Sequence, residues 1–161
     1  MEQEVERIKK IFSDLDILPE YLEHEAVITS NDAVKTSGFE LKQGVKAILF
    51  TKGKGEFVVV NVPANKKVDQ KIVAVANNWS KNSIRIATAE EVLTQTGCEI
   101  GSVPPFGHKN NLKTFFDEGI FKNDFNVFNI GLRTHSVKVK SSDLKKVFEK
   151  LKLIKGKFVK E

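Results

Sequence analysis

The chain has a single cysteine, Cys98, among its 161 residues. One thiol cannot form an internal disulfide, and without a cysteine pair the usual zinc-knuckle spacing is missing. Long apolar runs are missing too, since none approaches the roughly 18 residues that a membrane-spanning helix requires. The amino-terminal sequence MEQEVERIKKIF contains no apolar signal-peptide core. These absences predict a cytoplasmic protein that is neither secreted nor inserted in a membrane.

Familiar catalytic and nucleotide-binding motifs are also absent. The sequence has no Walker loop, no G-x-G-x-x-G and no G-x-S-x-G nucleophile elbow. It has one Trp and one Tyr, which leaves little surface for stacking on nucleic-acid bases unless some of its 12 Phe are exposed. A function must therefore be sought in less conventional groups of residues.

The composition that remains is typical of a globular domain. Apolar residues make up 40% of the chain and charged residues 29%, and the length fits one domain over residues 1–161. The net charge is +5, and seven lysines lie between residues 145 and 160 with Glu149 as the only acid among them. Such a segment can attract phosphate backbones, but charge alone favours a solvated amphipathic helix with a basic tail at residues 151–161.

The pattern of apolar residues predicts an α+β fold. Two β-branched and aromatic runs, at residues 45–51 and 57–62, flank a glycine-rich turn and indicate a hairpin. Thr88 and Glu91 form a capping box, which predicts a helix that Gly97 ends. Hairpins mixed with crossover helices favour a mixed sheet flanked by helices over a doubly wound fold or a β-barrel. The other predicted elements are helices at 2–15, 31–37, 68–79 and 143–151, and extended segments at 26–29, 83–87, 114–116, 126–130 and 136–140.

The segment GSVPPFGH, residues 101–108, is the first candidate for chemistry. Two adjacent prolines stiffen it, and the flanking glycines permit backbone conformations that other residues avoid. Such a loop can direct the N–H groups of Gly101, Ser102 and Val103 outward as a nest for a developing oxyanion. It can equally be a tight connection between a helix and a strand.

Lys46 is the second candidate, because it lies inside the apolar strand sequence VKAILF. Alternation places Lys46, Ile48 and Phe50 on one face of the strand and apolar residues on the other. Burying an unpaired ammonium group is costly, so the lysine must either extend to the strand end or face a polar pocket. The sequence leaves both possibilities open.

The three histidines and the cysteine give weaker evidence for a functional site. His24, His108 and His135 have no acidic or cysteine partner at metal-ligand spacing, so we expect no bound metal. His108 closes the Gly/Pro loop and is the histidine expected to line a site, whereas His135 opens a predicted strand. Cys98 has no paired histidine in the sequence pattern, and we expect it to be a small buried hydrophobe.

Several short segments, taken in order, resemble the YbaK/ProX family of aminoacyl-tRNA deacylases. This family also occurs as the editing domain inserted in bacterial prolyl-tRNA synthetases. The resemblance covers about residues 24–150, most of the chain. The segments that carry it are TSNDA at 29–33, GVK at 44–46, VP at 62–63 followed by VDQK at 68–71, ATAEE at 87–91, GSVPPFGH at 101–108 and NIGLR at 129–133.

The resemblance implies an α+β fold around a curved sheet and hydrolysis of the ester that joins a wrong amino acid to the 3′ end of tRNA. It implies that Lys46 holds the terminal adenosine, the aminoacyl group or the attacking water, and that Gly101 and Ser102 supply backbone donors to the ester carbonyl. No metal and no other cofactor is implied. The further residues expected to contact the substrate are Thr29, Ser30, Ile48, Phe50, Val103, Pro104, Pro105, Phe106, Gly107, His108, Gly131, Arg133 and His135.

The family suggests alanine or cysteine on the tRNA for proline as the substrate, and it leaves open whether water, a substrate hydroxyl or a substrate thiol attacks. Because 161 residues leave no room for an anticodon domain, we expect an enzyme that acts in trans. Its expected partners are the tRNA acceptor end and a synthetase, with no membrane and no DNA. Two alternatives stay open: a non-catalytic module that binds tRNA or single-stranded RNA, and a regulatory protein on the same fold.

Overall fold

The computed structural model describes residues 2–26 and 39–161. Within these residues the chain forms a mixed five-stranded sheet, in the order β4-β2-β3-β5-β8, and an antiparallel three-stranded sheet, in the order β1-β7-β6. The described helices are α1 (Glu2–Asp14), α3 (Gln70–Ala76), α4 (Ala89–Thr96) and α5 (Ser141–Lys150), with 3-10 turns η1 (Leu41–Gln43) and η2 (Glu118–Lys122). The described strands are β1 (Glu20–Glu23), β2 (Val45–Gly53), β3 (Glu56–Pro63), β4 (Arg85–Ile86), β5 (Lys113–Asp117), β6 (Phe125–Asn129), β7 (His135–Lys140) and β8 (Ile154–Gly156).

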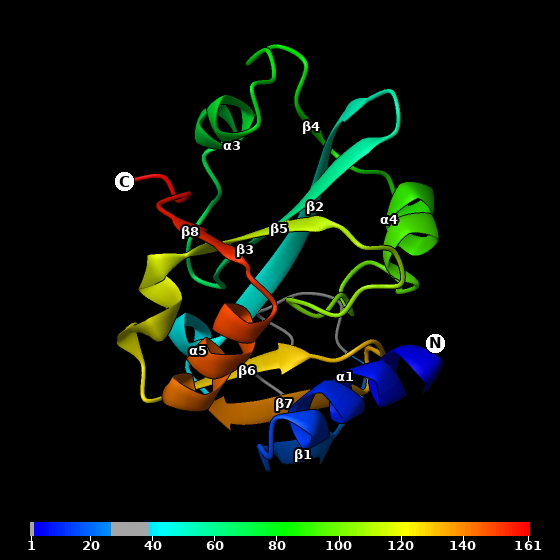
Figure 1. Cartoon of the computed structure of the whole chain (residues 1–161), viewed down its shortest axis with the longest axis vertical. Helices are drawn as coiled ribbons and strands as arrows, with labels where there is room; N and C mark the ends of the chain where they lie inside the picture. Colours follow the sequence, from blue (N-terminus) through cyan, green and yellow to red (C-terminus); the bar gives the residue numbers. More distant parts are fainter. Residues whose placement is uncertain (1, 27–38) are drawn as a thin grey trace.

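The β2–β3 hairpin forms the middle of the larger sheet, as the sequence predicts. Its turn has positive φ at Gly53, Lys54 and Gly55, which two glycines tolerate well. On its other edge β3 pairs in parallel with β5, and β5 pairs in parallel with β8. Figure 1 shows α3 above this sheet and the smaller sheet with α1 and α5 below it.

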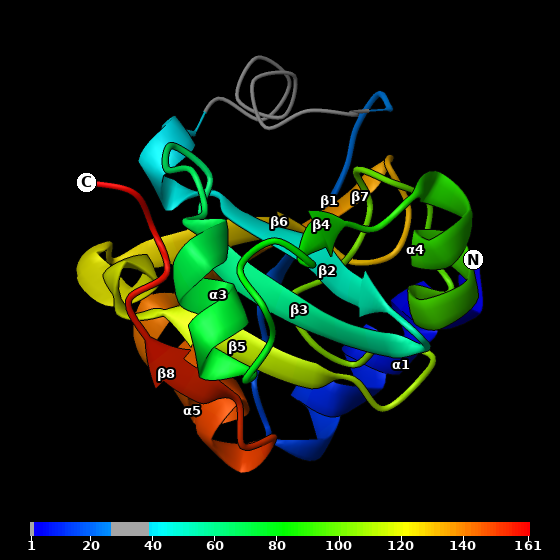
Figure 2. The ribbon, with the colours of Figure 1, turned by 90° about the horizontal axis from the view of Figure 1, so that it is seen from above.

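The two faces of the larger sheet belong to different cores. Ile48 and Phe50 face the side that α3 covers, with Val73 and Trp79, and the view from above in Figure 2 shows α3 lying across that face. The next residues along the strand face the opposite side. There Leu49 contributes to a second core that α4 and the Gly/Pro loop complete, and this arrangement confirms the predicted alternation.

A third core joins the smaller sheet to α1, α5 and the Gly/Pro loop. Its centre is Phe106, whose ring lies edge-on to those of Phe12, Phe128 and Phe148 at centroid distances of 5.7, 5.9 and 6.1 Å. Eight of the 12 Phe of the chain are buried, so most of the aromatic surface is committed to packing. The buried Phe are Phe12, Phe50, Phe106, Phe115, Phe116, Phe128, Phe148 and Phe158.

The predicted α+β class is confirmed, but the strands form two sheets instead of one. Strands β1 and β8 were not predicted, because both lie at sheet edges and are too polar or too short to show alternation. Helix α3 is shorter than the predicted 68–79, since Asp69 caps its start and Asn78 adopts a left-handed conformation just after its end. Strand β4 keeps only the last part of the predicted 83–87. The predicted helix at 31–37 and most of the extended segment at 26–29 lie outside the described residues.

None of the described helices has the length and the apolar character that crossing a membrane requires.

Candidate active site

Lys46 lies near the start of β2, where the two sheets meet. Just before the strand, Gly44 makes a parallel bridge to Val127 of β6, and its carbonyl accepts a hydrogen bond from Ala64 N at 2.8 Å. A Cβ on Gly44 would lie 2.9 Å from the Ala64 Cβ, closer than side-chain carbons approach. Gly44 therefore lets the backbones converge, and the junction fixes where the lysine emerges.

The Lys46 side chain is half-buried on the face of β2 that also carries Ile48 and Phe50. Its neighbour in register on β3 is Val62. Burial lowers the pKa of the Lys46 ammonium, and the positive charge of Lys67 lowers it further. The lysine thus extends neither into the core nor freely into water, and its ammonium group is partly desolvated near the start of the central hairpin.

The Gly/Pro loop is a rigid turn whose polar groups mostly bond within the protein. Gly101 and Gly107 have φ values of +89° and +70°, which side-chain-bearing residues rarely adopt. The Ser102 N–H and the Ser102 hydroxyl both donate to the Glu99 carbonyl, at 3.0 and 2.7 Å. The Ser102 carbonyl accepts a hydrogen bond from Gly131 N at 3.0 Å. This corrects one expectation, because the Ser102 N–H points into its own turn and not outward.

Two side chains hold the proline carbonyls of the loop, one of them buried and the other partly exposed. Asn61 Nδ2, on β3, donates to the Pro105 carbonyl at 2.8 Å and to the Phe115 carbonyl at 3.2 Å. His108 Nε2 lies 2.7 Å from the Pro104 carbonyl, which can only accept, so this nitrogen carries the proton. Burial lowers the pKa of His108 to about 4, and its ring is therefore neutral at pH 7. His108 braces the loop.

The structure brings the loop and the hairpin together, but on the face opposite the lysine. Val103 packs with Ala47 and Leu49 in the core below the sheet, whereas Lys46 shares its face with the core above. The contact between loop and hairpin runs through Asn61 and Pro105. Lys46 and the loop therefore flank the same stretch of β2 and β3 from its two sides.

The other predicted contact residues are distributed unevenly. Phe50 and Phe106 are each 1% exposed and belong to the cores, so they present no open surface. Gly131 is buried beneath α1, and Arg133 holds the loop from outside, through Ile100 O at 2.9 Å and the Glu99 carboxylate at 3.1 Å. His135 is paired with Glu23 of β1 at 3.2 Å. Thr29 and Ser30 lie outside the described residues.

The remaining histidine and the cysteine do not join this site. His24 Nε2 bonds the Ser136 hydroxyl at 2.7 Å, on the smaller sheet. Cys98 is fully buried, as predicted, and burial raises the pKa of its thiol to about 11, so the nucleophilic thiolate is disfavoured. Over the described ranges, no three His, Cys, Asp or Glu side chains gather in an arrangement suited to a metal ion.

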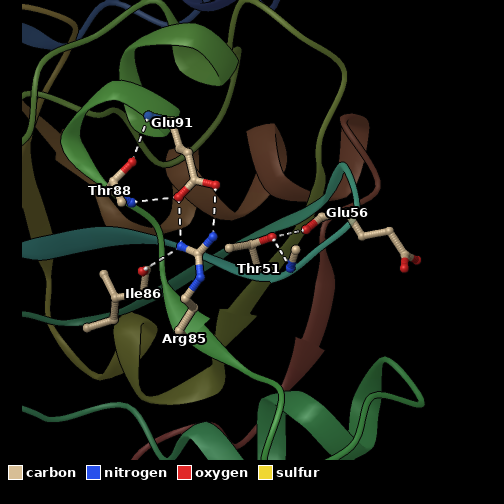
Figure 3. Close-up of polar contacts among 7 residues, drawn as sticks. Thr51, Glu56, Arg85, Ile86, Thr88 and Glu91 are labelled. Atoms are coloured by element: carbon tan, nitrogen blue, oxygen red, sulfur yellow. Dashed lines mark hydrogen bonds and ion pairs between the residues drawn. The ribbon is translucent and has the colours of Figure 1, made fainter.

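Helix α4 fixes the start of the loop. Figure 3 shows Arg85 of β4 donating to both carboxylate oxygens of Glu91, at 2.7 and 3.1 Å. Glu91 and Thr88 form the predicted capping box, with Thr88 N donating to Glu91 Oε1 at 2.9 Å. The hydrogen bond from Arg85 is the main reason why the pKa of Glu91 falls to about 2. Gly97 then ends the helix in a left-handed conformation and opens the loop.

Two residues near the site were missed in the sequence. Asn61 is the one polar residue in the strand sequence FVVVNV, and a lone amide in a buried strand signals a specific hydrogen bond. Lys67 gives no such signal, because it is an exposed residue in a lysine-rich turn. The carboxyl end of the loop also lines a hollow of about 590 Å³, which residues 151–154 close from the other side.

These features define a class of protein: a small α+β domain with a lysine on its central hairpin and a Gly/Pro loop bonded against that hairpin. Residues 24–147 match the family described as the aminoacyl-tRNA editing domain, and the chain belongs to this family. The resemblance seen in the sequence is thereby confirmed. Helix α1, the end of α5 and the whole basic tail lie outside the matched residues.

The relatives agree with this assignment. Proteins named multifunctional Ser/Thr-tRNA deacylase ProXp-y, from Escherichia coli strain K12 and from O157:H7, are each 33% identical to this chain over 123 residues. The aligned region is 74% of this chain and 73% of each relative.

Solved structures confirm the fold. A crystal structure presented as a candidate trans-editing enzyme for prolyl tRNA synthetase has a TM-score of 0.81 and 21% identity, over 98% of both chains. The crystal structure of a hypothetical protein has a TM-score of 0.83 and 16% identity, over 96% of this chain and 99% of the other.

Proposed function

We propose that this chain hydrolyses the ester bond of mischarged aminoacyl-tRNA in trans, and so releases the wrong amino acid from the 3′ end. The observation that carries the proposal is Lys46, a half-buried cation at the junction of the two sheets in a member of the editing family. Perturbed and partly desolvated ionisable groups are frequent at functional sites.

The reaction asks little of the protein beyond positioning. A water oxygen attacks the ester carbonyl carbon, and the carbonyl oxygen becomes an oxyanion. When the carbonyl re-forms, the bond to the ribose oxygen breaks, and that oxygen takes up the proton that the attacking water has released. Because the ester is already activated, orientation and donors aimed at the oxyanion supply most of the acceleration. We assign the Gly101 N–H to the oxyanion. Lys46 lies on the other face of the hairpin, so we assign it to holding the acceptor end of the tRNA through its charge. The mechanism requires no metal ion.

The substrate is proposed to be a small amino acid. A synthetase pocket gains only about 1–3 kcal/mol per methylene group, which is too little to reject smaller amino acids reliably. A second pocket that admits only the smaller product completes the selection. The family resemblance favours alanine or cysteine on the tRNA for proline, and the name of the Escherichia coli relatives adds serine and threonine.

The test is a deacylation panel with tRNAs charged with alanine, cysteine, serine, threonine and proline. We expect the wild-type chain to release at least one small amino acid, and Lys46→Ala to lose about 100-fold or more of that activity. Lys52→Ala is the matched control, because Lys52 lies on the same strand, at the bulge near its other end, and is paired with Glu56. The proposal fails if Lys46→Ala keeps full activity, or if the wild-type chain releases none of the five.

One observation favours a second candidate, a non-catalytic module for tRNA. Lys150, Lys152 and Lys155 are exposed, and no carboxylate in the described part of the chain lies within ion-pair distance of them. Salt-sensitive binding of tRNA without turnover of any aminoacyl ester would select this function over the deacylase.

A further inference from the structure

Three glycines with positive φ lie beneath α1, where a Cβ atom would come within 3.0 Å of side-chain atoms of the helix. A Cβ on Gly107 would lie 2.7 Å from Ile11 Cδ1 and 2.9 Å from Ile8 Cδ1. On Gly97 it would lie 2.6 Å from the Glu4 carboxylate. On Gly131 it would lie 2.8 Å from the Glu4 Cβ. The φ values of Gly97, Gly107 and Gly131 are +78°, +70° and +121°.

These glycines are the fixed points of the Gly/Pro loop. Gly97 opens the segment that leads into the loop, Gly107 closes it, and Gly131 donates its N–H to the Ser102 carbonyl in the middle. Helix α1 therefore contacts the loop at its start and its end, and contacts the strand connection that holds its centre. The side chains that make these contacts come from one face of the helix, at residues 4, 8 and 11.

Glu4 is the unusual member of that face. Its carboxylate is 2% exposed, is paired with Arg7, and leaves Oε1 without a hydrogen-bond partner in the described part of the chain. A buried carboxylate with one unsatisfied oxygen costs stability and contributes little in return. An apolar residue would pack here at lower cost, so the position favours a role that depends on the charged carboxylate packed against Gly97.

We propose that α1 is the positioning element of the Gly/Pro loop and that Glu4 is a positioning residue, acting on the reaction through the loop. The inference rests on the proposed deacylase function and adds to it a segment that the family match at residues 24–147 does not include. Main-chain donors stabilise an oxyanion only while their geometry is held within about 0.5 Å. We infer that the close fit of α1 over the three glycines holds the loop donors in that geometry.

The test compares two glycine substitutions that carry the same backbone strain. Gly107→Ala places a methyl group against α1, whereas Gly55→Ala, at φ +76°, places one in open space, with nothing within 4 Å. We expect Gly107→Ala to lower kcat by about 10- to 100-fold with KM little changed. We expect Gly55→Ala to keep kcat. Hydrogen exchange at the loop amides rises in the first variant alone.

Two further variants keep the inference falsifiable if Gly107→Ala folds poorly. Glu4→Gln keeps the size of the side chain and removes its charge, and we expect it to lower kcat at a temperature where circular dichroism shows the chain folded. Adding Ile11→Val and Ile8→Val to Gly107→Ala removes both clashing Cδ1 atoms and restores kcat.

The outcomes separate this inference from the function on which it rests. A wild-type chain that deacylates, together with folded Gly107→Ala and Glu4→Gln variants of unchanged kcat, overturns the positioning role alone. Raised KM with unchanged kcat also overturns it, because it would place α1 at the binding step. A wild-type chain without deacylase activity overturns the proposed function.

Discussion

Lys46 and the Gly/Pro loop differ in how much freedom the fold leaves them. Several independent contacts restrain the loop. Its prolines stiffen the backbone, Asn61 and His108 bond its carbonyls, and three glycines allow it to pack closely beneath α1. The Lys46 ammonium lies half-buried, and burial together with Lys67 lowers its pKa. The polar groups of the loop mostly form hydrogen bonds that hold the fold, whereas the Lys46 ammonium is the group that we assign to the substrate.

The contrast between the loop and Lys46 illustrates two ways in which a residue contributes to a site, by holding its geometry or by taking part in its chemistry. A residue that holds geometry also holds the fold, so its loss lowers stability and activity together. A residue kept for chemistry is a cost to the fold, and its removal separates activity from stability. The predictions below use this distinction.

The largest effect is expected for Lys46→Met. Methionine matches the length of lysine and suits the apolar wall that Ile48 and Phe50 provide. We expect deacylation to fall by about 100-fold or more, while the free energy of unfolding stays the same or rises by roughly 0.5–1 kcal/mol. Urea denaturation and single-turnover deacylation measure the two quantities. A clear loss of stability would show that the lysine is structural and would remove the contrast with the loop.

Asn61→Ala tests the other side of the comparison. Removing the Asn61 amide takes a hydrogen-bond donor from the buried carbonyls of Pro105 and Phe115. We therefore expect the free energy of unfolding to fall by about 1–3 kcal/mol. Activity should fall as well, because the loop loses one of its contacts with the hairpin. Asn123→Ala is the control, since its amide bonds the Lys42 carbonyl in an exposed setting, and it should cost less than about 0.5 kcal/mol. Equal effects of the two variants would contradict the loop's dependence on the hairpin.

The same distinction explains what the sequence could predict. The hairpin, the Thr88 capping box and the alternation around Lys46 depend on neighbouring residues, and all three are found as expected. The family resemblance added an expected chemistry for the loop but did not give its internal hydrogen bonds. The Ser102 N–H was expected to face outward, because sequence shows which residues can form a nest but not where their donors go.

Long-range placement is the part that the sequence could not predict. The pairing of β3 with β5 in parallel and the addition of β8 at the edge join segments far apart in the chain. The fit of α1 over Gly97, Gly107 and Gly131 is of the same kind. Each glycine in isolation indicates only a turn, and its crowded side becomes visible when the helix is in place.

A smaller effect is expected from the pH dependence of His108. In the folded chain its pKa is about 4, below the ordinary value near 6.5, because burial disfavours the charged ring. Between pH 6.5 and 4 the unfolded chain binds a proton that the folded chain does not, so stability falls as pH falls through this window. Relative to pH 7.5, we expect a loss of roughly 1–2 kcal/mol at pH 5.

His108→Gln provides the comparison for that measurement. Glutamine can still donate to the Pro104 carbonyl but does not titrate, so its unfolding free energy should lack this contribution. Urea denaturation at pH 7.5, 6 and 5 compares the two chains. If wild type and variant lose the same stability on acidification, His108 does not brace the loop as a neutral ring.

The smallest effect concerns the basic tail, which is outside both halves of the comparison. If Lys46 holds the acceptor end and the loop acts on the ester, affinity for the rest of the tRNA must come from other cations. Exposed lysines that touch phosphates release counterions, and each contributes to the slope of log K against log salt. Changing three of them to glutamine should flatten that slope by about 2–3, with kcat at saturating tRNA unchanged. The three lysines are Lys150, at the end of α5, and Lys152 and Lys155, in the tail.

A triple variant of equal charge on other exposed segments separates local contact from net charge. Lys54, Lys71 and Lys81 lie on the hairpin turn, on α3 and after α3, outside residues 150–155. Filter binding across a salt series should give them a slope close to that of the wild type. Lys152 also lines the hollow beside the loop, so a reduced slope for the tail variant alone would extend the tRNA path from the site along that side. Equal slopes for both triple variants would show that the tail acts through net charge, as a solvated surface.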